Sequence, residues 1–316
     1  MNTEHIIIAG GGTMGTSLVQ IFAQKGFAVT LYSRRQETLD RSQENIRVNQ
    51  EALVAQGVVS QEESQTLIKL IAFTNDKACF ADADLVIESI SEDMDVKKKF
   101  WDEISHLVPE NAILCTNTSG MSITEMATAV YRPERFTGMH WFNPPHIVQL
   151  VEVTKGEKTT DETADAVMEL SRKLGKKPVK VQKDIPGFIA NRLQYALLRE
   201  AAHLVESGAA SMEEVDLACS LVIGMRYACL GPFRVVDMGG VDIFNSVSNY
   251  LFEDLCDDKD GSRLLQDLVA QGKLGVKSGE GFYSYRKEEI PGLIKDRDSR
   301  YIRMVQCMDS FEEPEK

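Results

Sequence analysis

The sequence has no long apolar run and no basic, apolar leader at its start. None of its hydrophobic stretches reaches the roughly 18 residues that a membrane-spanning helix needs. The amino terminus lacks the positively charged segment and the apolar stretch that together mark a secretory signal. These absences predict a soluble globular protein of the cytoplasm that has no membrane partner.

Clustered cysteines and net positive charge are missing as well. The six cysteines are scattered through 316 residues without a C-x-x-C pair or a His/Cys cluster, so we expect neither a disulfide framework nor a metal site. The formal net charge is −13. This charge argues against a nucleic-acid partner, because binding phosphates requires a concentrated basic surface.

What the chain does have is a regular alternation of short apolar runs and longer amphipathic segments. Strands are predicted at residues 5–9, 27–32, 69–73, 84–89, 112–116, 135–140, 150–154 and 178–182. Helices are predicted at residues 13–25, 95–107 and 162–174, and the polar segment 36–68 is predicted to form a helical hairpin broken near Gly57. Alternating strands and helices indicate an α/β protein with a doubly wound, mainly parallel sheet.

Strand-like runs become scarce after "KDIPGFIANR", where helices are expected at residues 192–206 and 212–221. The chain is therefore predicted to have a dinucleotide-binding domain at residues 1–186 and an all-helical domain at 187–290 for substrate and dimer contacts. Residues 291–316 are treated as a C-terminal extension. Its acidic end, "DSFEEPEK", is expected to be a frayed tail.

A glycine motif, "GGGTMG", follows the first predicted strand and opens the first helix. Gly10 permits a tight turn, Gly12 lets the backbone approach a pyrophosphate, and Gly15 allows close packing of the helix. The N–H groups that begin the helix, at Thr13 and Met14, then face the anion. The motif predicts a Rossmann-like domain that binds a dinucleotide, although the same turn also occurs without a ligand.

The second predicted strand, 27–32, is followed by Ser33, Arg34 and Arg35, at the place where an acidic residue would hold the ribose hydroxyls of NAD. A serine and two arginines can instead bind a 2′-phosphate through charge-assisted hydrogen bonds. The cofactor is therefore predicted to be NADP(H) rather than NAD(H). The alternative is that both arginines are merely solvated.

The stretch "GMHWFNPPHIVQLVEV" places His140 at the end of one predicted strand and Glu152 on the next. A carboxylate beside an imidazole can orient and charge it, and histidine is a suitable acid/base near neutral pH. Taken alone, such a pair is more often structural. It is accompanied here by "TNTSGMSITEMA" upstream and "PGFIANR" downstream.

Together these motifs resemble those of the 3-hydroxyacyl-CoA dehydrogenase family, and the resemblance continues through "LGPFRVVDMGGVD" to "LGVKSGEGFYSY". It implies that His140 is the catalytic acid/base, Glu152 its carboxylate partner, and Ser119 and Asn191 the hydrogen-bonding residues for substrate. It also implies a homodimer. Positions that match the family's cofactor contacts are Glu92, Lys97, Asn117, Asn143 and Lys277.

The helical insertion departs from the family pattern, because family members that use coenzyme A typically carry lysines there. Between residues 26 and 68 this chain has no lysine, and its basic residues are Arg34, Arg35, Arg41 and Arg47. Three alternatives follow. The first is that the substrate is a 3-hydroxyacyl-CoA. The second is that it is a small hydroxy acid or alcohol, as in the pyridine-alcohol dehydrogenases of vitamin B6 breakdown. The third is that the protein is a crystallin-like structural protein without activity.

Overall fold

The computed structural model describes residues 4–311. By its internal contacts the chain divides into two compact units, with the division between Arg192 and Leu193. This point lies in the first turn of helix α7 (Ala190–Glu206), just after the predicted domain boundary at residue 186. The two units are described separately below.

The first unit contains an eight-stranded sheet in the order β3-β2-β1-β4-β5-β6-β7-β8. The strands are β1 (Ile6–Ala9), β2 (Val29–Tyr32), β3 (Ile71–Thr74), β4 (Leu85–Glu88), β5 (Ile113–Thr116), β6 (Phe136–Trp141), β7 (Leu150–Thr154) and β8 (Lys177–Val181). All neighbouring pairs are parallel except β6 and β7, which are antiparallel. The predicted doubly wound, mainly parallel sheet is confirmed.

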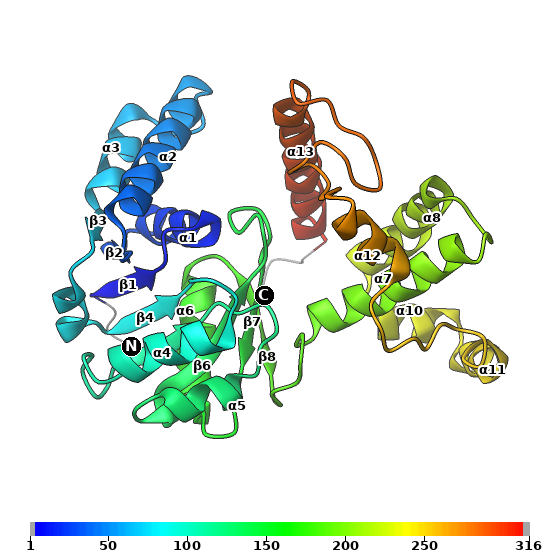
Figure 1. The fold of residues 1–316 in the computed structure, drawn as a ribbon, viewed down its shortest axis with the longest axis horizontal. Helices are drawn as coiled ribbons and strands as arrows, with labels where there is room; N and C mark the ends of the chain where they lie inside the picture. Colours follow the sequence, from blue (N-terminus) through cyan, green and yellow to red (C-terminus); the bar gives the residue numbers. More distant parts are fainter. Residues whose placement is uncertain (1–3, 312–316) are drawn as a thin grey trace. The chain divides into compact units, whose positions relative to one another are not determined.

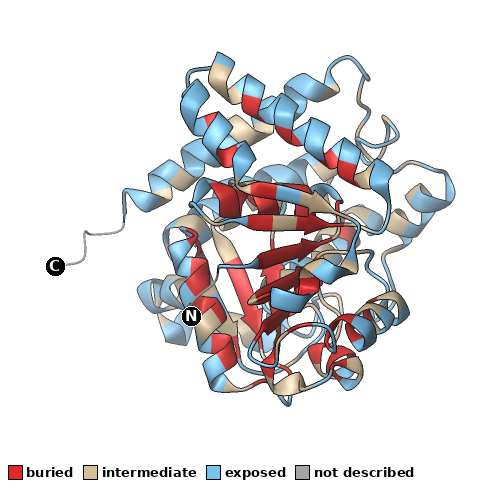
Figure 2. Ribbon diagram, turned by 90° about the vertical axis from the view of Figure 1, so that its left-hand side faces the viewer, coloured by how far each residue is buried: buried red, intermediate tan, exposed pale blue. Residues whose placement is uncertain are grey.

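Helices cover both faces of this sheet. They are α1 (Thr13–Gln24), α2 (Gln36–Ala55), α3 (Gln61–Lys69), α4 (Met94–Ile104), α5 (Ile123–Met126) and α6 (Asp161–Lys173), with short 3-10 turns at η1 (Lys77–Asp82), η2 (Ala127–Ala129) and η3 (Pro133–Arg135). Ile6 and Ile8 of β1 belong to one core cluster with side chains of α1 and α6, whereas Ile7 belongs to a second cluster with Trp101 of α4. Successive strand residues point to opposite faces, so the central strands β1, β4 and β5 are buried on both sides and are nearly continuous apolar runs (Figure 2).

Helices α2 and α3 form the predicted hairpin, and they lie side by side at the β3 end of the sheet (Figure 1). The break between them is at Gly57, whose φ of +68° suits glycine. Ser60 and Glu63 then start α3 with a reciprocal capping box.

The second unit is helical, as predicted. Beyond α7 its elements are α8 (Met212–Ala218), the π-helical turn η4 (Cys219–Gly224), α9 (Met225–Cys229), α10 (Pro232–Gly239), α11 (Val241–Leu251), α12 (Arg263–Ala270) and α13 (Ile290–Asp309). No single helix in residues 4–311 is long and apolar enough to span a membrane, although Met212–Cys229 and Pro232–Gly239, bent by 94°, reach that length and composition together.

Helix α13 makes up most of the segment that was treated as a C-terminal extension. Residues 290–309 form a helix of 20 residues, and Pro291 lies in its first turn. Proline is well tolerated there, because the first N–H groups of a helix have no intrahelical partner. The predicted frayed end "DSFEEPEK" overlaps the last residue of this helix, and residues 312–316 lie outside the described residues.

Candidate active site

The glycine turn between β1 and α1 is built as tightly as its sequence suggests. Gly10 has a φ of +121°, and a Cβ there would lie 2.3 Å from Ser89 O. A Cβ at Gly15 would lie 1.8 Å from Gly10 O, whereas a Cβ at Gly12 would meet no atom within 4 Å. Gly10 and Gly15 therefore shape the turn, and Gly12 faces open space.

That open space suits a pyrophosphate. Helix α1 begins after Gly12 without a side-chain cap, and its first turn has no acidic residue. A cavity of about 550 Å³ adjoins the turn and is lined by Gly11, Gly12, Thr13, Thr16, Ser17, Gln20, Arg41, Asn45, Val48 and Asn49. Uncapped N–H groups and a polar cavity next to a residue without a side chain fit a bound dinucleotide. The side chain of Met14 packs partly buried against the core, which leaves its backbone N–H in the uncapped first turn of α1.

At the end of β2, the Ser33 N–H donates to Thr74 O, with an N···O distance of 3.2 Å. Arg34 and Arg35 are exposed, and neither forms an ion pair with another described residue. Arg47 in α2 differs, because its Nη2 lies 2.5 Å from Glu44 Oε1 and its Nη1 lies 2.5 Å from Glu51 Oε1. Two uncompensated cations therefore follow this strand.

His140 on β6 and Glu152 on β7 are direct partners across the antiparallel pair. His140 Nδ1 lies 2.9 Å from Glu152 Oε2, and both side chains are buried. Glu152 Oε1 also accepts hydrogen bonds from the N–H groups of Ile189 and Ala190, at 2.9 and 2.8 Å. Because Glu152 engages Nδ1, the other ring nitrogen of His140 is the one available to a substrate.

The charge state of this dyad depends on Glu152. Burial by itself would raise the pKa of Glu152, but the hydrogen bonds from His140 and from the two backbone N–H groups outweigh it. The pKa of Glu152 is therefore held below its ordinary value, and the side chain is a carboxylate at neutral pH. A carboxylate can stabilise the imidazolium that forms when histidine accepts a proton.

Ser119 lies on the loop after β5, and the start of α7 holds this loop. Asn191 Nδ2 donates to Ser119 O at 2.6 Å, and the Ser119 N–H donates to Glu92 Oε1 at 2.7 Å. Asn191 directly follows the two residues whose N–H groups bind Glu152. The segment 189–191 therefore connects all four predicted catalytic residues.

Asn117, on the same loop, bonds to the protein on both sides of its amide. Its Oδ1 accepts the N–H of Trp141 at 2.9 Å, and its Nδ2 donates to Ser89 Oγ at 3.2 Å. These bonds tie the loop to the strand residue next to His140. Asn143, predicted as a cofactor contact, is exposed beyond the end of β6.

The predicted cofactor contact at Lys97 has a different environment from the one expected. Its side chain is fully buried, and its Nζ lies 2.5 Å from Glu88 Oε1 and 3.3 Å from Glu92 Oε2. Both carboxylates that contact this ammonium belong to the protein. Sequence reasoning missed Glu88, although an acid that ends the apolar strand "LVIE" was a usable signal.

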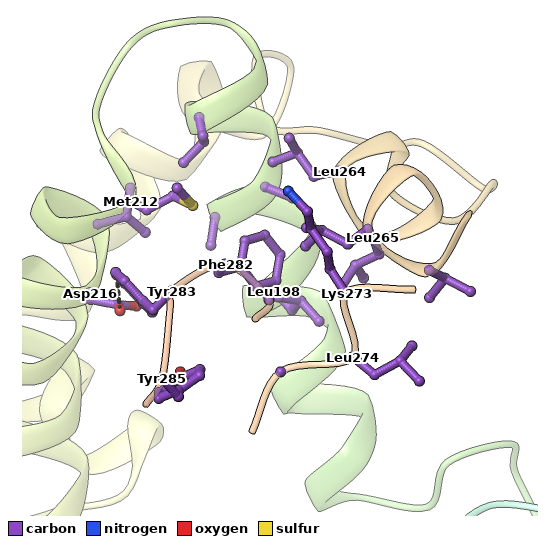
Figure 3. A pocket seen from close by; sticks show the side chains of 18 of the residues that line it. Leu198, Met212, Asp216, Leu264, Leu265, Lys273, Leu274, Phe282, Tyr283 and Tyr285 are labelled. Carbon is purple, nitrogen blue, oxygen red and sulfur yellow. Dashed lines mark hydrogen bonds between the residues drawn. The ribbon is translucent and has the colours of Figure 1, made fainter. Parts of the chain in front are cut away.

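Lys277, the remaining predicted cofactor contact, belongs to the second unit. It lines a cavity of about 670 Å³ whose walls come from α7, α8, α12 and the segment 273–285 (Figure 3). The lining residues labelled in Figure 3 are mostly apolar. Among the polar ones, the Tyr283 hydroxyl donates to Asp216 Oδ2 at 2.8 Å. Among the described residues no group of His, Cys, Asp and Glu side chains could hold a metal ion.

The chain matches two family models, one directly after the other. Residues 5–185 match the NAD binding domain of 3-hydroxyacyl-CoA dehydrogenase, and residues 187–285 match its C-terminal domain. A probable 3-hydroxybutyryl-CoA dehydrogenase of Deinococcus radiodurans is 40% identical over 88% of this chain and 99% of its own length. The 5-formyl-3-hydroxy-2-methylpyridine 4-carboxylate 5-dehydrogenase of Mesorhizobium japonicum is 36% identical over 98% of this chain and 99% of its own.

Solved structures agree with these sequence matches. A crystal structure of a 5-formyl-3-hydroxy-2-methylpyridine 4-carboxylic acid 5-dehydrogenase, described as an NAD+-dependent dismutase, has a TM-score of 0.89 at 35% identity over 98% of this chain and all of the other. The (S)-3-hydroxybutyryl-CoA dehydrogenase of Ralstonia eutropha has a TM-score of 0.76 at 33% identity, over 90% of this chain and all of the other. With its two domains matched in order, this chain belongs to the 3-hydroxyacyl-CoA dehydrogenase family and is a dehydrogenase that acts on hydroxyl groups.

Proposed function

We propose that the protein oxidises a hydroxyl carbon reversibly, with His140 as the acid/base. The observation that carries this proposal is the buried bond between His140 Nδ1 and Glu152 Oε2 at 2.9 Å. A bound nicotinamide dinucleotide would accept the hydride. His140 takes the hydroxyl proton on its second ring nitrogen, Glu152 stabilises the resulting imidazolium, and Ser119 donates a hydrogen bond to the reacting oxygen.

We propose a small carboxylate-bearing substrate without coenzyme A. Of the two arginines that could replace the missing lysines, Arg41 and Arg47, the second is neutralised by Glu44 and Glu51. The solved pyridine dehydrogenase matches this chain with a TM-score of 0.89, against 0.76 for the (S)-3-hydroxybutyryl-CoA dehydrogenase. Both observations favour the relative that acts on a pyridine carboxylate.

A 3-hydroxyacyl-CoA is the second candidate, because the relative at 40% identity is named as a 3-hydroxybutyryl-CoA dehydrogenase. Nicotinamide absorbance separates the two when the enzyme is given acetoacetyl-CoA or 5-formyl-3-hydroxy-2-methylpyridine 4-carboxylate, each with NADPH and with NADH. We expect turnover of the pyridine aldehyde. Turnover of acetoacetyl-CoA alone would establish the second candidate, and cofactor binding with no turnover of either probe would reject both substrates.

We further propose that NADP(H) is preferred, since Ser33, Arg34 and Arg35 offer two unpaired cations where NAD-binding domains use an acid. The variant Ser33→Asp/Arg34→Gln/Arg35→Gln should lower the ratio of kcat/KM for NADPH to that for NADH by roughly 10- to 100-fold, since it removes charge-assisted hydrogen bonds. Arg47→Gln, which removes a cation already paired with two carboxylates, is the control. An unchanged ratio in the triple variant would show that these residues do not select the cofactor.

The second unit also supports a homodimer. Helices α9 to α13 contain no buried residue, and Phe233, Met238 and Phe252 are 85%, 81% and 72% exposed. Apolar surface of this extent generally belongs to an interface. The mostly apolar cavity shown in Figure 3 adds further apolar surface to this unit.

Light scattering should therefore give a particle of about twice 35.3 kDa. Phe233→Glu should dissociate it, because a charge would be buried in the interface. Val58→Glu, at a residue 65% exposed on the α2–α3 loop, should leave the dimer intact. A wild-type particle of only 35.3 kDa would refute the dimer.

A further inference from the structure

Lys176 is a buried lysine at the edge of the sheet where ligands are expected. It directly precedes β8, and only 8% of the residue is exposed. Strand β8 runs parallel to β7, and β7 runs antiparallel to β6, so the start of β8 lies at the same edge as the end of β6. Strands β1, β4, β5 and β6 are parallel and all end at this edge, and α/β sheets bind ligands beyond the carboxyl ends of their parallel strands.

The ammonium of Lys176 holds the loop at residues 142–149, which connects β6 to β7. Its Nζ donates to Pro145 O at 2.6 Å and to Val148 O at 2.9 Å. It also lies 5.6 Å from the centroid of the Trp141 ring, within the range of a cation–π contact. One side chain thus binds the loop at two points and contacts the residue that precedes it.

This arrangement is not the one that core packing alone would favour. Burial, together with the positive charge of Lys25 at the end of α1, lowers the pKa of Lys176 to about 8, so the ammonium is mostly charged at pH 7. The partners that accept its hydrogen bonds are carbonyl oxygens and not carboxylates. Burying such a charge costs free energy, which the charge-assisted hydrogen bonds offset in part. A methionine would fill the space at lower cost, but it could not hold the two carbonyls.

Asn143 is the exposed residue of this loop that the family resemblance assigns to the cofactor. Strand β6, which leads into the loop, lies four strand spacings from β2 in the sheet, or roughly 19 Å. The adenosine end of a dinucleotide is expected beyond β2, at Ser33. A contact from Asn143 would therefore fall on the nicotinamide end.

We propose that Lys176 is a positioning residue that holds loop 142–149 so that Asn143 meets the nicotinamide end of the cofactor. This inference rests on the proposed dinucleotide-dependent function. Lys176 acts through the backbone carbonyls of the loop and needs no contact with the cofactor itself. The expected effect is on cofactor affinity, because a loop that is already ordered loses less conformational freedom when the ligand binds.

The first test is Lys176→Met, which removes both hydrogen bonds to the loop and leaves no unpaired buried charge. Nucleotide fluorescence should show that the dissociation constants of NADH and NADPH both rise by about 10-fold, because two charge-assisted hydrogen bonds no longer order the loop. The ratio of the two constants should stay within about 2-fold of the wild-type ratio, because the 2′-phosphate would bind near β2. Lys176→Arg keeps the charge and the donors and should recover most of the affinity.

Lys176→Gln has a shorter, uncharged side chain and replaces the methionine variant if that variant does not fold; the dissociation constants should again rise. The matched control is Lys155→Met, directly beyond the other end of β7. Lys155 is 18% exposed at its side chain, and its Nζ binds Asp161 Oδ1 at 2.6 Å. Its variant should leave both dissociation constants unchanged.

Amide hydrogen exchange reports on the loop itself. The peptide containing residues 143–149 should exchange faster in Lys176→Met than in Lys155→Met, because the loop has lost the side chain that restrains it. Equal exchange in the two variants would show that Lys176 does not order this loop and would overturn the inference.

A double-mutant cycle with Asn143→Ala then shows whether the effect passes through Asn143. If it does, adding Lys176→Met to Asn143→Ala should raise the dissociation constants by less than about 2-fold. Equal losses in both backgrounds, or wild-type affinity in either single variant, would overturn this inference. None of these measurements requires turnover, so a protein that binds NADH or NADPH but oxidises no substrate would refute the proposed reaction alone.

Discussion

His140→Gln should lower kcat by about 10³-fold, because positioned acid/base groups commonly contribute 10²- to 10⁴-fold. A glutamine amide can still donate to Glu152 Oε2, which now lies 2.9 Å from His140 Nδ1, so the buried carboxylate keeps a partner. It cannot accept the hydroxyl proton. Rapid-mixing measurements of hydride transfer report the loss directly, and cofactor fluorescence should show unchanged binding.

The matched control is His106→Gln. His106 stacks on Tyr131, with ring centroids 4.6 Å apart, and touches none of the proposed catalytic residues. Its variant should retain the wild-type kcat. Turnover that survives in His140→Gln would show that another group moves the proton.

The second large effect is expected at the glycine turn. Gly15→Ala would place a methyl group 1.8 Å from Gly10 O, and neither backbone can move without displacing α1 from β1. We expect the free energy of unfolding to fall by about 3 kcal/mol, at the upper end for overpacked sites. Thermal denaturation, followed by circular dichroism, measures this change.

Gly12→Ala is the comparison that separates folding from binding. A Cβ at this position meets no protein atom within 4 Å, so the melting temperature should remain close to that of the wild type. Cofactor affinity should nevertheless fall by about 10-fold or more, since the methyl group occupies the space where the pyrophosphate approaches. Equal affinity in Gly12→Ala and the wild type would mean that the dinucleotide does not lie over this turn.

Several features were predictable because they depend on local pattern. Parallel strands buried on both faces are continuous apolar runs, and all eight predicted strands occur in the sheet. The glycine motif predicted the tight turn, which the structure confirms at Gly10 and Gly15. The pairing of His140 with Glu152 followed from two adjacent strands, although its antiparallel register appeared only in the structure.

Other features depend on contacts between distant segments. The sequence shows Lys97 in a run of three lysines that is typical of a solvated helix face, yet this lysine alone is fully buried because Glu88 of β4 lies beneath it. Likewise, no spacing rule indicates that Asn191 binds the carbonyl of Ser119. Helix α13 was not predicted, and Pro291 and Gly292 near its start are the two residue types least favourable inside a helix.

The sequence by itself determined the alternating fold, the dinucleotide turn and the chemical types available for catalysis, because periodicity and side-chain chemistry are local properties. The tertiary structure decided which charges are neutralised and which remain available. Arg47 is bound by Glu44 and Glu51, and Lys97 lies between Glu88 and Glu92, whereas Arg34 and Arg35 make no ion pair among the described residues. An electrostatic interaction depends on distance and burial, and only the folded chain sets these.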